Sequence, residues 1–276
     1  MKNKMTLDLQ SVQGTMLLPL WGRAEYSQKY PETLDDRTAI EIVNKLDFDF
    51  SPIREKFGEF GGLCYIIRAR KIDDMIHEFI QKHPQATIVN IGSGLDTTFS
   101  RIDNGKIHWY NLDLPDAIEF RKSFIPDSER NICISKSLFD LSWFDDIAFN
   151  PEDGILFVSG GVFYYFKDED MKQFFSSMAS RFPGGEVYFD AESKRAIAFS
   201  NRMVKKTGNH GAMMYFYVNS GKKIKSWSAD ISDVNCLKYF ENLPRNKNWS
   251  FQSRIRMGML DGLKMTKFVH VKFRSA

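Results

Sequence analysis

The stretch Thr87–Arg101, TIVNIGSGLDTTFSR, decides the fold of this chain. A short apolar run that ends at glycine predicts a strand buried on both faces, as in a parallel sheet. Gly92 and Gly94 allow backbone angles that other residues resist, and they let a ligand approach the main chain. A helix starting near Asp96 would direct its free N–H groups at that ligand. The stretch therefore predicts a strand, a ligand-binding turn and a helix.

The segments around this turn continue the alternation of strand and helix over about residues 85–190. Further buried strands are predicted in 106–115, 131–135, 154–160 and 186–190, and helices in 68–84, 116–125 and 169–182. Such alternation is typical of an α/β fold, with a parallel sheet, right-handed crossovers and helices on both faces. Near the end, KFVHVKF (267–273) alternates like an edge or hairpin strand.

Composition excludes several classes of protein. With 276 residues and 43% hydrophobic content, the chain can bury the full core of a soluble domain. The net charge of +3 is small, so we infer no nucleic-acid partner. Three scattered cysteines support neither a disulfide framework nor a metal site, and they favour a reducing compartment. We recognise no leader peptide and no membrane-spanning run, and we predict a cytoplasmic monomer or homodimer with no membrane partner.

The acid that follows the glycine turn indicates the kind of ligand. Asp113 ends the next predicted strand, about 20 residues on, where a carboxylate can accept hydrogen bonds from both ribose hydroxyls of a nucleoside. A dinucleotide fingerprint would have a third glycine where this chain has Thr97. A nucleoside without a pyrophosphate is therefore favoured, and S-adenosylmethionine (SAM) is the common example. The alternative is an ordinary strand–helix turn with a surface aspartate.

The sequence resembles SAM-dependent methyltransferases of the leucine carboxyl methyltransferase family, in the branch related to polyketide O-methyltransferases of tetracenomycin type. The resemblance spans about residues 20–192 and is carried by GSGLDT (92–97), DLPDAIEFR (113–121), SLFDLSWFDDI (137–147) and GGVFYYFKDEDMKQFF (160–175). It implies a class I methyltransferase fold: a seven-stranded, mostly parallel sheet with helices on both faces and the last strand antiparallel.

The resemblance also implies how one methyltransferase domain is divided along residues 1–276. Its expected parts are an N-terminal helical cover in 1–65, a SAM-binding core in 66–190, a lid insertion in 191–245 and C-terminal strands in 246–276.

The cofactor site is implied by the same motifs. Arg68 would pair with the SAM carboxylate, which suits a guanidinium fork; Asp113 would hold the ribose, and Ser137 and Leu138 the adenine. One position departs from the family pattern, because Gly160 stands where an acid is usual. The residues predicted to bind the cofactor are Arg68, Gly92, Ser93, Gly94, Leu95, Asp96, Thr97, Asp113, Leu114, Ser137, Leu138, Gly160 and Gly161.

The acceptor of the methyl group is less well defined by the sequence. Methyl transfer mainly requires positioning, and a carboxylate acceptor needs no base, whereas a phenol would benefit from one. Tyr165 and His210 are the candidate catalytic residues. We expect a small apolar or aromatic, polyketide-like acceptor with one carboxylate or hydroxyl, contacted by Tyr165, Arg195, Arg202, Met213 and Tyr215. No HExxH motif, ligand-spaced carboxylate pair or Cys/His cluster is present, so no metal is expected.

Three functional classes follow. The first is a methyltransferase acting on an oxygen of a small molecule. The second, raised by Gly160, is a SAM-binding sensor without turnover. The third is a nicotinamide-dependent oxidoreductase, which Thr97 and the absence of a Tyr-x-x-x-Lys pair disfavour.

Overall fold

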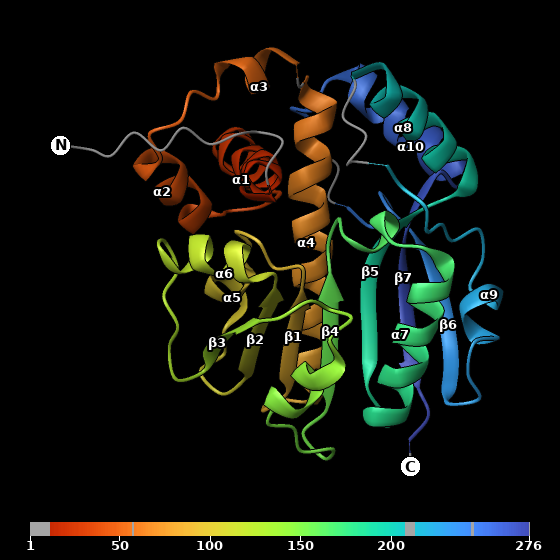
Figure 1. Cartoon of the computed structure of the whole chain (residues 1–276). Helices are drawn as coiled ribbons and strands as arrows, with labels where there is room; N and C mark the ends of the chain where they lie inside the picture. Colours follow the sequence, from red (N-terminus) through yellow and green to blue (C-terminus); the bar gives the residue numbers. More distant parts are fainter. Residues whose placement is uncertain (1–11, 57, 208–212, 244–245, 276) are drawn as a thin grey trace.

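A seven-stranded sheet forms the centre of the computed structural model, which describes residues 12–56, 58–207, 213–243 and 246–275 (Figure 1). Its strand order is β3-β2-β1-β4-β5-β7-β6, and only β7 runs against the others. The strands are β1 (Thr87–Ile91), β2 (His108–Asp113), β3 (Asn131–Ser135), β4 (Ile155–Ser159), β5 (Glu186–Glu192), β6 (Ile231–Lys238) and β7 (Thr266–Phe273). The predicted α/β fold class is confirmed, including the antiparallel last strand.

Helices cover both faces of the sheet, and the N-terminal helices lie beyond the carboxyl ends of its strands (Figure 1). Both faces of the sheet are apolar and need cover, because side chains alternate along each strand. In β1, for example, Ile88 and Val89 belong to different hydrophobic cores. The helices are α1 (Val12–Lys29), α2 (Arg37–Lys45), α3 (Ser51–Lys56), α4 (Glu59–Lys82), α5 (Thr98–Ile102), α6 (Pro115–Lys122), α7 (Asp168–Arg181), α8 (Lys194–Thr207), α9 (Lys222–Lys225) and α10 (Phe251–Gly262). Two 3-10 turns are also present, η1 (Leu141–Asp146) and η2 (Phe163–Tyr165).

Helix α4 begins at Glu59, well before the predicted start near residue 68. Its first turns contain Gly61 and Gly62, which weaken a helical pattern because glycine disfavours helix interiors. A Cβ added at Gly62 would lie 2.0 Å from the ring of Tyr26 in α1, so glycine is required for the two helices to touch. Close packing between helices, which the sequence pattern does not reveal, therefore sets the residue at this position.

The segment 191–245 differs from the irregular lid that the sequence predicts. It contains α8, α9 and the strand β6, and the segment 246–276 contains α10 and one strand instead of several. Strand β6 escaped prediction because it lies at the sheet edge, where most of its side chains are exposed and polar. The expected apolar alternation is consequently absent from ISDVNCLK (231–238).

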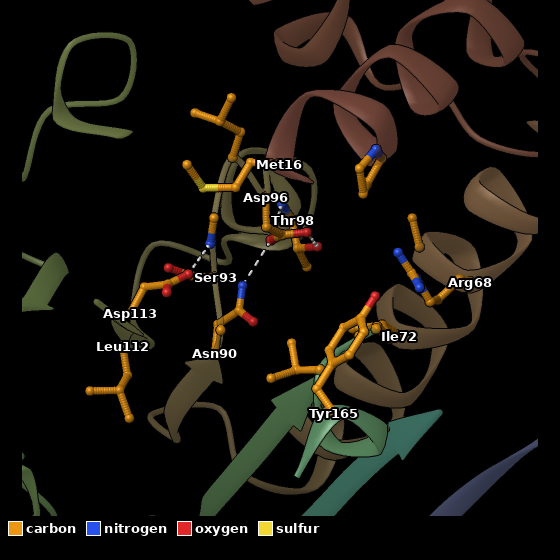
Figure 2. A pocket seen from close by; sticks show the side chains of 18 of the residues that line it. Met16, Arg68, Ile72, Asn90, Ser93, Asp96, Thr98, Leu112, Asp113 and Tyr165 are labelled. Carbon is orange, nitrogen blue, oxygen red and sulfur yellow. Dashed lines mark hydrogen bonds between the residues drawn. The ribbon is translucent and has the colours of Figure 1, made fainter. Parts of the chain in front are cut away.

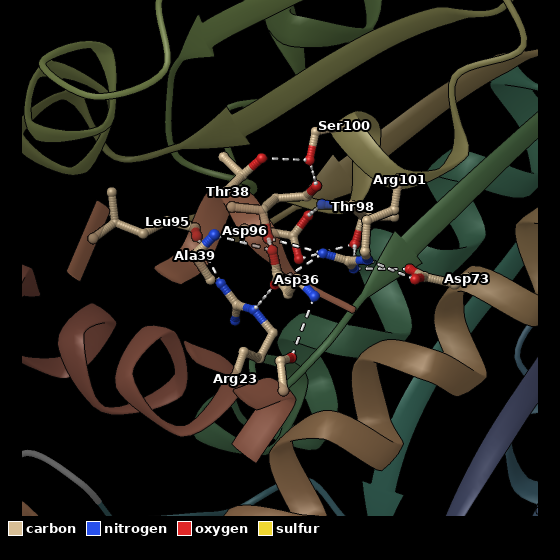
Figure 3. A network of polar contacts seen from close by, with 12 residues as sticks. Arg23, Asp36, Thr38, Ala39, Asp73, Leu95, Asp96, Thr98, Ser100 and Arg101 are labelled. Atoms are coloured by element: carbon tan, nitrogen blue, oxygen red, sulfur yellow. Dashed lines mark hydrogen bonds and ion pairs between the residues drawn. The ribbon is translucent and has the colours of Figure 1, made fainter. Parts of the chain in front are cut away.

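A buried ionic network joins the N-terminal helices to the glycine turn (Figure 3). Asp36 is completely buried at the start of α2, and its carboxylate accepts hydrogen bonds from Arg23 Nε at 3.0 Å and Thr97 Oγ1 at 2.6 Å. Arg101 Nη1 lies 2.9 Å from the same carboxylate, and its fork binds Asp73 of α4 at 2.7 and 2.9 Å. Burial alone would raise the pKa of Asp36, but the two guanidinium groups hold it below its ordinary value.

We predict that Asp36→Ala lowers the free energy of unfolding by about 3–5 kcal/mol, the usual cost of breaking a buried ion pair. Arg23 would keep a buried charge without its carboxylate, and Arg101 would lose one of two. Urea unfolding followed by tryptophan fluorescence measures the change. Asp35→Ala is the matched control, since Asp35 and its partner Arg37 are exposed and should contribute less than about 1 kcal/mol. Equal losses in the two variants would refute a structural role for the network.

Candidate active site

A cavity of about 630 Å³ lies at the carboxyl ends of β1, β2 and β4 (Figure 2). The strand order reverses between β1 and β4, and ligands of doubly wound sheets bind at such a reversal. Residues of α1 and α4 complete the walls. Figure 2 shows Asp113 on one side of the cavity and Arg68 and Tyr165 on the other.

The glycine turn forms the floor of the cavity and has the backbone that the sequence predicts. Gly92 and Gly94 have φ angles of 69° and 44°, in the left-handed region that favours glycine. A Cβ on Gly92 would lie 2.5 Å from Val162 Cγ2, so the turn also needs glycine for space. The amides of Gly92 and Ser93 both donate to Leu112 O, at 2.8 and 3.2 Å, which fixes the turn against β2.

Asp113 belongs both to the turn and to the cavity wall. Its Oδ2 accepts a hydrogen bond from Gly94 N at 2.7 Å, and its Oδ1 accepts one from Leu114 N at 2.8 Å. Burial raises the pKa of Asp113 despite these two bonds. Each carboxylate oxygen has a second lone pair, so Asp113 can accept further hydrogen bonds from a ligand while it holds the turn.

Ser93 offers an unused polar group to a ligand. Its Oγ is buried in the cavity wall and has no hydrogen-bond partner among the described residues. A buried hydroxyl without a partner costs free energy, and a polar ligand can remove that cost.

Arg121 supports the turn from behind and was not anticipated from the sequence. This side chain of α6 is 1% exposed, and its Nη1 donates to Gly94 O at 2.9 Å and to Asp96 O at 2.6 Å. The signal in the sequence is its place four residues after the buried Ala117, on the apolar face of α6. An arginine among apolar helix positions indicates a buried cation with a specific acceptor.

Arg68 faces the cavity from α4. Its Nη1 lies 3.4 Å from Asp190 Oδ2, and Asp190 Oδ1 accepts a hydrogen bond from Gly161 N at 2.6 Å. Burial opposes the charge on Arg68, but Asp190 and neighbouring tyrosines raise its pKa, so the guanidinium stays ionised. Gly161 has a φ angle of 82°, in the left-handed region that favours glycine, and a Cβ there would lie 2.5 Å from Arg68 Nη1 and displace the guanidinium. A carboxylate therefore lies beside Arg68 although residue 160 is glycine, and β5 supplies it.

The structure brings together all the predicted cofactor residues except Thr97, since the others line the cavity. Thr97 is 2% exposed, and its hydroxyl donates to Asp36. The side chain of Thr97 is bonded within the buried network and does not face the cavity, contrary to its predicted role in cofactor binding. Asp96 lines the cavity, but its carboxylate also accepts a hydrogen bond from Thr98 N at 2.9 Å at the start of α5.

Of the predicted acceptor contacts, only Tyr165 lines the cavity. Arg195 and Arg202 are exposed on α8, away from it. Met213 and Tyr215 do not reach it either: the amide of Tyr215 donates to Tyr164 O at 2.7 Å, and its side chain is 51% exposed. Contrary to the prediction, the structure does not bring these four residues to the cavity. His210 lies outside the described residues.

Across the described ranges, no group of three or more His, Cys, Asp or Glu side chains is placed to hold a metal ion. Cys64, Cys133 and Cys236 are free thiols. Among the helices that the structure describes, none combines the length and apolar character needed to cross a bilayer.

Solved structures share this architecture. A putative methyltransferase from Thermobifida fusca YX matches with a TM-score of 0.54 and 11% identity, covering 76% of this chain and 82% of that one. A DUF574 family protein from Streptomyces avermitilis matches with a TM-score of 0.54 and 8% identity, covering 78% and 89%. At this identity the likeness concerns the fold, which together with the glycine-turn cavity is that of a class I SAM-dependent methyltransferase.

The leucine carboxyl methyltransferase family model matches residues 18–179, so the chain belongs to that family, and its cofactor is SAM. The tetracenomycin polyketide synthesis O-methyltransferase TcmP of Streptomyces glaucescens is 29% identical over 206 residues, which are 74% of this chain and 75% of TcmP. The SAM-dependent methyltransferase dpfgK of Gibberella zeae is 21% identical over 260 residues, 88% of this chain and 84% of dpfgK. The predicted family and cofactor are confirmed.

Glu192, at the end of β5, is a half-buried carboxylate that the sequence did not single out. Ser200 Oγ donates to its Oε2 at 3.3 Å, and burial raises its pKa to about 7 from 4.5. The folded protein therefore binds this proton more tightly than the unfolded chain, and the resulting loss of stability develops as pH rises from 4.5 to 7.

We predict that Glu192→Gln stabilises the protein at pH 8 by on the order of 2 kcal/mol, because the amide carries no charge to bury. At pH 4.5 the variant and the wild type should unfold at the same urea concentration. A stabilisation that is equal at both pH values would show that ionisation of Glu192 is not its cause.

Proposed function

We propose that this methyltransferase transfers the SAM methyl group to an oxygen atom of a small apolar or aromatic, polyketide-like molecule. The likeness to the tetracenomycin O-methyltransferase carries the proposal. The cavity supports it, because apolar side chains line the part that Asp113 and the glycine turn do not occupy. These include Leu18, Ile53, Ile72, Tyr165 and Phe166.

The cavity has suitable groups for each part of SAM, which supplies a methyl group bonded to a sulfonium. The guanidinium of Arg68 would hold the amino-acid carboxylate, with N–H groups beyond its single contact to Asp190. Asp113 would accept hydrogen bonds from the ribose, and Ser137 and Leu138 would contact the adenine. The unpaired hydroxyl of Ser93 fits a polar ligand in the same place.

The groups around the acceptor part of the cavity favour a carboxylate over a hydroxyl. Burial raises the pKa of Tyr165, so its hydroxyl remains protonated and serves as a donor rather than as a base. Among the described lining residues, the two carboxylates, Asp96 and Asp113, belong to the glycine-turn side. A carboxylate acceptor is already ionised and needs no base, while Tyr165 can orient it.

The decisive experiment incubates the protein with SAM and a pair of acceptors, an aromatic hydroxy acid and its carboxamide. The amide keeps the hydroxyl group and lacks the carboxylate. We expect release of S-adenosylhomocysteine with the acid alone, and a product that yields methanol in alkali, as a methyl ester does. An alkali-stable product from both compounds would instead identify hydroxyl methylation. SAM binding without turnover, across a panel of such pairs, would overturn the proposal and favour the sensor alternative.

We predict that Asp113→Asn weakens SAM binding by about 1.5–3 kcal/mol, the range for hydrogen bonds to a charged group. The overall fold should persist, because the amide retains the size of the side chain and burial already disfavours its charge, although its NH2 group cannot accept one of the two backbone hydrogen bonds that hold the turn. Isothermal titration calorimetry with SAM measures the effect. Asp116→Asn, which removes an exposed acid in the first turn of α6, should leave the affinity unchanged. Normal SAM binding by a folded Asp113→Asn variant would reject the assignment.

Tyr165→Leu is predicted to change acceptor turnover while SAM affinity stays within about three-fold, well below the effect of losing a charged hydrogen bond. The ring lies in the cavity wall and is 40% exposed, so its loss should not unfold the protein. Tyr215→Leu is the control, because that residue is also exposed but lies outside the cavity wall. Steady-state kinetics with a fixed acceptor distinguish the two. Identical turnover in both variants would place the acceptor elsewhere.

A further inference from the structure

A second hollow, of about 500 Å³, opens between α8, the turn after α10 and the start of β7. None of its lining residues lines the cofactor cavity. Four of the described residues in its wall are cationic, and none is acidic. The cations are Lys194, Arg195, Lys264 and Lys267. A wall with one sign of charge attracts ions of the opposite sign.

Lys267 distinguishes this hollow from a group of surface lysines. The residue lies in β7 and is only 5% exposed. Among the described residues its ammonium has one hydrogen-bond acceptor, Val218 O at 2.6 Å, although an ammonium has three N–H groups. No described carboxylate lies within ion-pair distance of it. Burial of a cation without a counter-ion is costly, and it lowers the pKa of Lys267.

The sheet register explains why no neighbouring acid neutralises Lys267. Its cross-strand partners are Ala191 in β5 and Lys238 in β6. Glu192 is paired with Thr266, so it belongs to the opposite face of the sheet, because side chains alternate along strands. The strand pairing therefore places Lys238 beside Lys267 and keeps the carboxylate of Glu192 on the other face of the sheet.

The oxygens of the other polar side chains of the hollow are already engaged. Ser193 Oγ accepts a hydrogen bond from Ala196 N at 3.2 Å, and Asn219 Oδ1 accepts one from Lys194 N at 3.1 Å, at the start of α8. By contrast, the exposed side chains of Arg195 and Lys264 have no hydrogen bond or ion pair with another described residue. Recognition in the hollow consequently falls to the cations.

We propose that this hollow is a second binding site, which takes the phosphate group of a phosphate ester. A phosphate monoester carries close to two negative charges at neutral pH and several strong acceptor oxygens, which suits a buried ammonium flanked by a guanidinium and further lysines. The exposed side chain of Leu263 at the rim would contact an apolar part of the ester. The site is separate from methyl transfer, and its existence does not depend on the identity of the methyl acceptor.

The test titrates the full chain with pyrophosphate and with inorganic phosphate in a calorimeter at constant ionic strength. We expect saturable binding, weakened about ten-fold or more in Lys267→Met, since that variant loses a charge-assisted hydrogen bond. Arg195→Gln, at an exposed position where folding is not at risk, should also weaken binding. The control Lys172→Gln removes an exposed lysine of α7 and should bind as wild type. SAM affinity should be unchanged in all three variants.

Two results would overturn the proposal. One is the absence of saturable binding of either anion to the wild type. The other is an affinity in Arg195→Gln and Lys267→Met that equals that of Lys172→Gln, which would indicate only general attraction to positive charge.

Vesicle sedimentation then identifies the source of the phosphate. Retention on phosphatidic acid vesicles, absent on phosphatidylcholine and lost in Lys267→Met, would assign the site to a lipid headgroup. Pyrophosphate binding without vesicle retention would assign it to a soluble ester. Retention that persists undiminished in Lys267→Met would contradict a role for the hollow.

Discussion

The carboxylate of Asp36, completely buried between two guanidinium groups, is the interaction on which the architecture of the site depends. It begins α2, binds Arg23 of α1 and, through Thr97 and Arg101, reaches the glycine turn and α5. Arg23 Nη2 also donates to Leu95 O at 2.7 Å, inside the turn itself. Helices α1 and α2 and the cofactor turn are therefore held together, because separating them would leave buried charges without partners.

The parts of the fold that follow from local pattern could be predicted from the sequence. The strand 87–91 and the turn after it are short, apolar and ended by glycine, so periodicity and backbone freedom determine them. Strand β6 could not be recognised, because an exposed edge has no apolar alternation. The early start of α4 could not be recognised, because Gly62 interrupts the helical pattern. Glycine is required there by the close contact with Tyr26, a residue distant in the sequence.

In the candidate site, too, residues within local motifs could be predicted, whereas contacts between distant segments could not. Residues in contiguous motifs, such as Gly92–Asp96 and Asp113, line the cavity as expected. Interactions between distant segments could not be predicted from the sequence. Thr97 binds Asp36, and Arg121 binds the carbonyl groups of the turn. The structure does not bring the acceptor contacts expected in 195–215 to the cavity, because apolar composition does not say which way a segment faces. Its backbone docks on Tyr164, and Phe216 enters the core instead.

Thr97 has an evolutionary consequence. It occupies the position where dinucleotide-binding proteins have the third glycine of their fingerprint, and here its hydroxyl is bonded to Asp36. Replacement of Thr97 by glycine would remove a hydrogen bond that the buried carboxylate accepts, so a change toward pyrophosphate binding would also weaken the attachment of the N-terminal helices. A single residue, Thr97, thus affects both the preferred ligand and the stability of the fold.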